Sequence, residues 1–259
     1  MKRSSPLPRS ISKAARSGRS WLALWALAFS VHAVQATPLA ADAGFAPARP
    51  SGSQPLRHAK VAHLGSEQAS PEVRHVANWA LHSGDHLGLP FAVVDKQESR
   101  VFIFDAEGRL RGSTPALVGS ARGDHSVPGI GSRPIQSILP EERTTPAGRF
   151  AASMGRGPKG EDILWIDYEG ALAMHRVVTS VPEERRLQRL ASKVALDRRI
   201  TYGCINLPVK FYENVVVPAF QHKGGIVYIL PETGRPQEVF GSYEVAPETA
   251  AGVMHTRMQ

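Results

Sequence analysis

Short runs of β-branched and aromatic residues, each ended by turn-forming residues, limit the fold of this chain more than any other feature. The runs lie at 91–95, 100–105, 116–119, 163–168, 171–178 and 225–230. Polar turns separate neighbouring runs, with KQES after the first and Glu169-Gly170 between the fourth and fifth. Runs of this length that end at turn residues are typical of strands joined in hairpins. We therefore expect a mainly β fold with a few helices, built on a β-meander.

Three other segments have helical periodicity. Ser70-Pro71-Glu72 provides an N-cap, a proline at the first helical position and an acidic first turn, and Gly84 ends that helix. A second, amphipathic helix is predicted over 182–197, after a capping box that pairs Ser180 with Glu183. Its apolar stripe comprises Leu187, Leu190, Ala191 and Val194, and its outer face is basic. A third helix is predicted over 209–220.

The remaining organisation follows from composition. Residues 37–70 are rich in Ala, Pro, Ser and Gly and predict a flexible linker. Residues 71–89 form a packing helix and lead-in, residues 90–232 the main domain, and residues 233–259 a tail.

The N-terminus has the layout of a secretory signal peptide. Six basic residues and no acidic residue precede Trp21, and an apolar run extends from Trp21 to Val34. The run is about 14 residues long, whereas a membrane-spanning helix needs about 20. We predict a signal peptide over 1–36, cleaved after Ala36, with Ala33 as a second candidate; the alternative is an uncleaved anchor.

Charge excludes one class of partner once the signal peptide is removed. The whole chain has 31 basic and 23 acidic residues, and the chain after Ala36 keeps 25 basic and 23 acidic, a net charge of +2. Nucleic-acid binding requires a dense patch of Lys and Arg, so we expect no nucleic-acid partner. No later apolar run reaches spanning length, so we also expect no stable membrane insertion after cleavage.

Cys204 is the only cysteine, so the chain cannot form an internal disulfide. The residue is therefore a free thiol, an intermolecular bridge or an inert core residue. It follows Gly203, and glycine permits an unusual turn and a close approach of substrate. A nucleophilic cysteine needs a base or a positive field that lowers the thiol pKa, and histidine is the usual partner. A buried structural cysteine is the competing interpretation.

His175 is the strongest histidine candidate because it lies in the predicted strand 171–178, directly before the segment that leads to Cys204. A strand holds a side chain rigidly. A core histidine bonded to backbone is the alternative. His82 and His86 have metal-like spacing, but Gly84 interrupts the helix and no third ligand is near, so we expect no metal and no cofactor. Gly155 to Gly160 resembles a phosphate loop but lacks Lys-Ser/Thr, and predicts only a turn.

Four ordered motifs together resemble the L,D-transpeptidase catalytic domain family. The opening AVVDKQESRVFIFDAEGRL is similar to that family's first hairpin, TTPAGRF to its Thr-Pro-x-Gly-x-Phe segment, MHR to its histidine segment, and TYGCINL to its Ser/Thr-His-Gly-Cys signature. The resemblance covers about residues 90–232. Tyr202 stands where the family usually has a second histidine, and 182–197 is additional to the usual spacing.

The resemblance implies a β-sandwich of mixed sheets, with helix 182–197 inserted between the histidine strand and the cysteine loop. It implies an exported cysteine enzyme, in the periplasm or cell wall, that acts on peptidoglycan stem peptides through a thioester. His175 would be the general base of the Cys204 nucleophile, and backbone N–H groups at Gly203 and Cys204 would stabilise the oxyanion. The implied site residues are Cys204, His175, Gly203 and Tyr202 for catalysis, and Asn206, Arg176 and Thr201 for substrate binding.

Several outcomes remain open at this level. The product of a transpeptidase would be a wall cross-link or a protein attached to the wall, with that protein as acceptor. The alternative functions are an L,D-carboxypeptidase or endopeptidase of the same substrates, and a noncatalytic wall-binding protein. The basic helix 182–197 is expected to pack its apolar stripe on the sheet. Arg185, Arg186 and Arg189 would then hold an anionic substrate or form an ordinary solvated face.

Overall fold

The computed structural model describes residues 60–246. The predicted signal peptide 1–36, linker residues 37–59 and tail residues 247–259 lie outside the described residues. None of the helices in the described range is both long and apolar enough to cross a membrane.

A large mixed sheet dominates the fold, as expected from the short apolar runs. Its strand order is β3-β2-β1-β10-β5-β6-β7-β9, and β4 pairs separately with β8. The strands are β1 Phe91–Asp95, β2 Arg100–Phe104, β3 Leu110–Pro115, β4 Val118–Gly119, β5 Gly148–Arg156, β6 Asp162–Asp167, β7 Leu172–Arg176, β8 Arg199–Thr201, β9 Ile205–Leu207 and β10 Gly225–Ile229. The first three strands form the predicted antiparallel meander. The pairs β1–β10 and β7–β9 are parallel.

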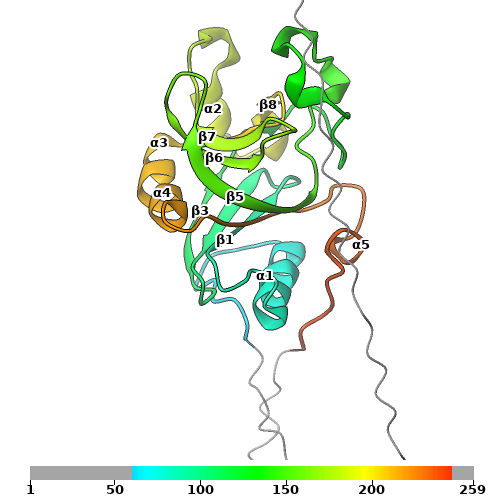
Figure 1. Ribbon diagram of the computed structural model, residues 1–259, viewed down its shortest axis with the longest axis vertical. Helices are drawn as coiled ribbons and strands as arrows, with labels where there is room; N and C mark the ends of the chain where they lie inside the picture. The colour runs from blue at the N-terminus through cyan, green and yellow to red at the C-terminus, as the bar shows by residue number, and fades with distance from the viewer. Residues whose placement is uncertain (1–59, 247–259) are drawn as a thin grey trace, which may run out of the picture. The chain divides into compact units, whose positions relative to one another are not determined.

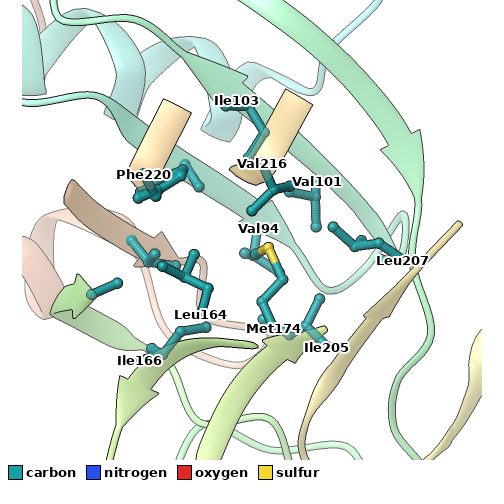
Figure 2. Close-up of a cluster of buried hydrophobic side chains, with 14 of the residues drawn as sticks. Val94, Val101, Ile103, Leu164, Ile166, Met174, Ile205, Leu207, Val216 and Phe220 are labelled. Carbon is teal, nitrogen blue, oxygen red and sulfur yellow. The ribbon is translucent and has the colours of Figure 1, made fainter. Parts of the chain in front are cut away.

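One strand, β5, belongs to both halves of the sheet. Its first part, from Gly148 to Ala152, pairs with β10, and its second part, from Ser153 to Arg156, pairs with β6. Apolar side chains of β1 and β2 thereby pack against those of β6, β7 and β9 in one core, which Figure 2 shows in close-up. This arrangement agrees with the expected packing of two β layers.

The opposite face of β1, β2 and β10 is covered by helices. Helix α1, Pro71–Ser83, begins at the Ser70 cap and ends at Gly84 in the left-handed conformation, as the sequence predicted. Its buried face packs on Phe91, Phe104 and neighbouring apolar residues, and Figure 1 shows the helix beside β1.

The predicted helix over 209–220 is present, with a change of helical type along it. It consists of α3 Val209–Phe211, a π-helical segment Tyr212–Val216 and α4 Val217–Phe220. Tyr212, Val216 and Phe220 are buried in the core between the two parts of the sheet.

The predicted continuous helix over 182–197 is wrong. The segment contains a 3₁₀ turn Pro182–Glu184, a short helix α2 Arg186–Ala191 and a second 3₁₀ turn Ala195–Arg198. Arg185 adopts a left-handed φ of 50° between the first two elements, and a helix cannot continue through that conformation. Leu187 and Val194 are more than half exposed, so the expected apolar stripe does not pack on the sheet; only Leu190 is buried.

Both flanks of the expected domain contribute to the fold within the described residues. Leu64, in the predicted linker, is buried in the cluster under α1. The predicted tail contains α5, Pro236–Phe240, and the Phe240 ring lies 6.4 Å from Trp79 and 5.8 Å from Tyr228. The run 116–119 contributes only β4, and β5 was not predicted because Pro146 and Gly148 indicated a turn.

Candidate active site

The pairing of β7 with β9 determines which side chains share a face. Met174 is opposite Ile205, and His175 is opposite Asn206. Because side chains alternate along a strand, Met174 and Ile205 enter the core while His175 and Asn206 lie on the other face. Cys204, two positions before Asn206, is expected on that same face. The sheet therefore places His175 beside Asn206, and it places Cys204 directly before the strand that carries Asn206.

The Cys204 thiol is partly exposed and donates a hydrogen bond to the Ala171 carbonyl, with Sγ 3.5 Å from the oxygen. Burial raises the pKa of this thiol; backbone N–H groups at Ala173 and Cys204 and the Arg186 charge act in the opposite direction without reversing the shift. The resting thiol is therefore protonated at neutral pH, whereas the sequence analysis expected a lowered pKa.

His175 has hydrogen-bond partners on both ring nitrogens. Nδ1 lies 2.8 Å from the Arg176 carbonyl oxygen, and Nε2 lies 3.1 Å from the amide nitrogen of Asn206. Burial lowers the pKa of the imidazole, and the Arg186 charge lowers it further, against opposing effects of the Arg176 carbonyl and Glu161. His175 is therefore neutral at pH 7, the state that a general base requires.

The cysteine loop is held by Thr201 and Gly203. Gly203 has a φ of 136°, and a Cβ atom at this position would lie 2.8 Å from the Thr144 carbonyl oxygen, which explains the glycine. Thr201 Oγ1 accepts a hydrogen bond from the Gly203 N–H at 3.2 Å and donates one to the Cys204 carbonyl at 2.7 Å. The Gly203 N–H is thus bonded to Thr201 in this conformation and would have to leave that partner to act as the predicted oxyanion donor. Thr201 holds the loop.

The Tyr202 ring packs against the positively charged side chain of Arg143. The Arg143 guanidinium lies 4.1 Å from the centre of the Tyr202 ring, and Arg143 also donates to the Ile138 carbonyl. The contact holds the ring at the wall of the pocket beside Cys204.

Arg176 does not join the site. It alternates with His175 along β7, and its guanidinium bonds Asp162 at 2.9 Å and Glu213 at 2.9 Å while covering the Tyr212 ring at 4.7 Å. In this conformation the Arg176 guanidinium is occupied by these partners, and substrate binding by Arg176 stays a prediction.

A pocket of about 160 Å³ opens onto the thiol. Apolar side chains of Ile130, Ile135, Ile138 and Leu172 line it together with Tyr202 and Cys204. Gly131 lies so close to the β6–β7 turn that a Cβ atom would approach the Glu169 carbonyl within 2.1 Å. The 3₁₀ turn Ile130–Ser132 therefore packs directly on the turn that precedes the thiol's acceptor, Ala171.

Two residues near the thiol loop, Thr145 and Lys96, were not predicted as site residues, and Arg186 was predicted only as one of three arginines that could hold an anionic substrate. Thr145 Oγ1 donates to the Gly203 carbonyl at 2.7 Å, and the buried Lys96 ammonium donates to the Thr145 carbonyl at 2.9 Å. Arg186 donates to the Asn206 amide oxygen at 2.7 Å. The TTPAGRF motif and the arginine-rich segment indicated these regions, but neither indicated the contacts.

Within residues 60–246 there is no group of three or more His, Cys, Asp or Glu side chains that could hold a metal ion.

No protein-family model matches the chain, and a search of curated proteins finds no match. Among solved structures, the chain is similar to a fused Zn-dependent amidase/peptidase/peptidoglycan-binding domain-containing protein from Clostridium acetobutylicum ATCC 824. The identity is 14%, the TM-score is 0.32, and the match covers 63% of this chain and 64% of that chain. It is also similar to the catalytic domain of an E. faecium L,D-transpeptidase, at 14% identity and a TM-score of 0.31, over 54% of this chain and 95% of that domain.

Proposed function

We propose that the chain is an exported cysteine L,D-transpeptidase that acts on peptidoglycan stem peptides. The observation that carries the proposal is the placement of the chain's only thiol in a largely apolar pocket, directly before β9, the strand that pairs with the His175 strand β7. The four sequence motifs that resemble the L,D-transpeptidase catalytic domain family supply the substrate class.

The proposed reaction has two acyl-transfer steps. Cys204 gives its proton to Nε2 of His175 and attacks the carbonyl that precedes a terminal D-residue. The C–N bond breaks, and the departing amine takes the proton from His175, which leaves a thioester. An amine of a second stem or of a wall-attached protein then attacks the thioester, loses its proton to His175 and restores the thiol.

The resting geometry requires two movements before the first step. The thiol must turn from the Ala171 carbonyl toward His175, and the Asn206 amide must share or leave Nε2. Substrate that fills the pocket beside Ala171 would displace the thiol from its carbonyl acceptor. The same substrate would exclude water from the reacting atoms.

A noncatalytic wall-binding protein with a structural cysteine is the second candidate, and burial raises the pKa of the Cys204 thiol as it would for a structural cysteine. A structural cysteine has no need of a low pKa. Hydrolysis of the same stem bonds, with water as acceptor, is a variant of the first candidate.

Incubation with purified stem tetrapeptides and mass spectrometry of the products tests the proposal. We expect loss of the terminal residue and formation of a cross-linked dimer, and no product from Cys204→Ala, whose fold is retained because little volume is lost. Trimmed monomer without dimer would identify a hydrolase. Absence of any product with the unaltered chain, or turnover by Cys204→Ala, would refute the mechanism.

A further inference from the structure

Arg186 is the one arginine of the predicted basic face that reaches the thiol site. Its side chain is 14% exposed, with Nη1 2.7 Å from the Asn206 oxygen and Nε 2.6 Å from Glu184. Arg189 instead donates to backbone carbonyls of its own segment, at Glu184 and Asp197, and Arg185 is exposed. The short helix α2 therefore delivers a single cation to the site.

This contact determines how the Asn206 amide is oriented. A guanidinium can only donate hydrogen bonds, so the amide must present its oxygen to Arg186. The amide nitrogen then faces Nε2 of His175, at 3.1 Å. Asn206 is 1% exposed, so water cannot replace either partner freely.

The amide orientation in turn determines where His175 carries its proton. The Asn206 nitrogen can only donate, so Nε2 must accept and carries no proton. The proton of the neutral ring then lies on Nδ1, where it is donated to the Arg176 carbonyl at 2.8 Å. The Nδ1–H tautomer places the basic lone pair on Nε2, on the face that Cys204 shares.

We propose that Arg186 is a positioning residue that selects the Nδ1–H tautomer of His175 through the amide of Asn206. The proposal deepens the proposed function and rests on it for the use of His175 as a base. The tautomer itself is a property of the resting protein and can be measured without turnover.

Four charged or titratable groups bear on His175 and enter any pH dependence. Arg186 from α2 and Glu161 from the β5–β6 turn act on it directly, Glu184 acts through its ion pair with Arg186, and the Cys204 thiol is the group that His175 would deprotonate in the proposed reaction. Removal of the Arg186 charge leaves the Glu161 charge, which favours the protonated imidazole, and therefore raises the pKa of His175.

The test combines a ring-nitrogen spectrum with kinetics on the full chain. Long-range ¹⁵N–¹H correlation of ¹⁵N-histidine protein reports the tautomer, and comparison with His175→Gln assigns the signal. The variants are Arg186→Met, Arg186→Lys and Asn206→Asp. Arg185→Met is the matched control, because it removes the same charge from the neighbouring exposed position.

We expect the unaltered chain, Arg186→Lys and Arg185→Met to have the Nδ1–H tautomer. Arg186→Met should show an Nε2–H population and a kcat lowered roughly 10- to 100-fold with little change in KM, the usual effect of losing a hydrogen bond to a charged group. In Asn206→Asp the new carboxylate can only accept, so Nε2 of His175 should stay protonated and kcat should fall.

An Nε2–H tautomer in the unaltered chain would overturn the inference, as would equal spectra for Arg186→Met and Arg185→Met. A chain that shows the expected tautomers and turns over no stem peptide would retain the inference and refute the proposed function. If the unaltered chain turns over stem peptide, and Arg186→Met has the same spectra and kinetics, the proposed function stands and the inference about Arg186 is refuted.

Discussion

Replacement of Lys96 by methionine should destabilise the fold strongly, because this ammonium has no exposed surface. Its Nζ donates to Asp124 at 2.8 Å and to the carbonyls of Gly123 at 2.7 Å and Thr145 at 2.9 Å. Methionine fills a similar volume and supplies no donor. The substitution therefore leaves a buried carboxylate without its cation and two carbonyls without a donor.

The expected size of the effect follows from that arrangement. Removal of one partner of a buried ion pair costs about 3–5 kcal/mol of unfolding free energy. For a domain of this size each kcal/mol lowers Tm by about 2–4 °C, so Lys96→Met should lower it by about 6–20 °C. The thiol loop should also loosen, since Thr145 bonds the Gly203 carbonyl.

Urea unfolding followed by tryptophan fluorescence measures the loss, with the exposed Lys210→Met as the matched control. The double variant Lys96→Met/Asp124→Asn should recover part of it, because the carboxylate charge is then removed as well. A loss below about 1 kcal/mol for Lys96→Met would refute the reasoning that the buried pair is tightly coupled.

The lowered pKa of Asp124 determines how the stability of the fold changes with pH. Burial raises the pKa of Asp124, but hydrogen bonds from Lys96, Thr233 and backbone N–H groups outweigh it, so the pKa is well below its usual range. A carboxyl with a lowered folded-state pKa contributes stability above its unfolded pKa and loses it as pH falls through the folded value. Lys96→Met should therefore reduce the loss of stability in acid.

Two further substitutions test the site and the C-terminal packing. Gly203→Ala should lower the free energy of unfolding by about 1–3 kcal/mol, because the left-handed φ of Gly203 and the nearby Thr144 carbonyl both oppose a side chain. The substitution should also change the rate at which Cys204 is alkylated. An unaltered alkylation rate and an unaltered Tm would contradict this. Phe240→Ala should cost about 1–2 kcal/mol, less than a fully buried phenylalanine, since its partly buried ring packs against both Trp79 and Tyr228; unchanged urea unfolding would show that α5 is dispensable.

Helix caps and the alternation of apolar runs with turns predicted the parts of the fold that are determined by residues close in sequence. Ser70 and Pro71 specify where α1 begins and Gly84 where it ends, through contacts with residues close in sequence. The strands of the meander are likewise marked by the polar turns between them. The helix over 182–197 failed because periodicity does not reveal a left-handed residue such as Arg185. An amphipathic pattern also does not say whether a sheet is available to cover it.

The two main candidate residues, Cys204 and His175, could be named from the sequence, but the contacts around them could not. Cys204 was the only thiol and His175 lay in a strand, so each was visible in the sequence. Lys96 and Arg186 act through contacts with Thr145 and Asn206 that arise only when distant segments pair. Strand alternation is a local signal, and it indicates that Arg176 points to the face opposite its neighbour His175.

The centre of the sheet joins the two ends of the described chain. Phe91 of β1 pairs with Ile226 of β10, so β1 finds its parallel partner only after all the strands between them have been synthesised. Until then, β1 has only β2 beside it, and β5 lacks the partner of its first half. Pairings this distant in sequence form slowly. A ribosome-bound chain that ends before Gly225 would therefore expose unpaired strand edges, and we expect such nascent chains to be bound by chaperones until the last strand emerges.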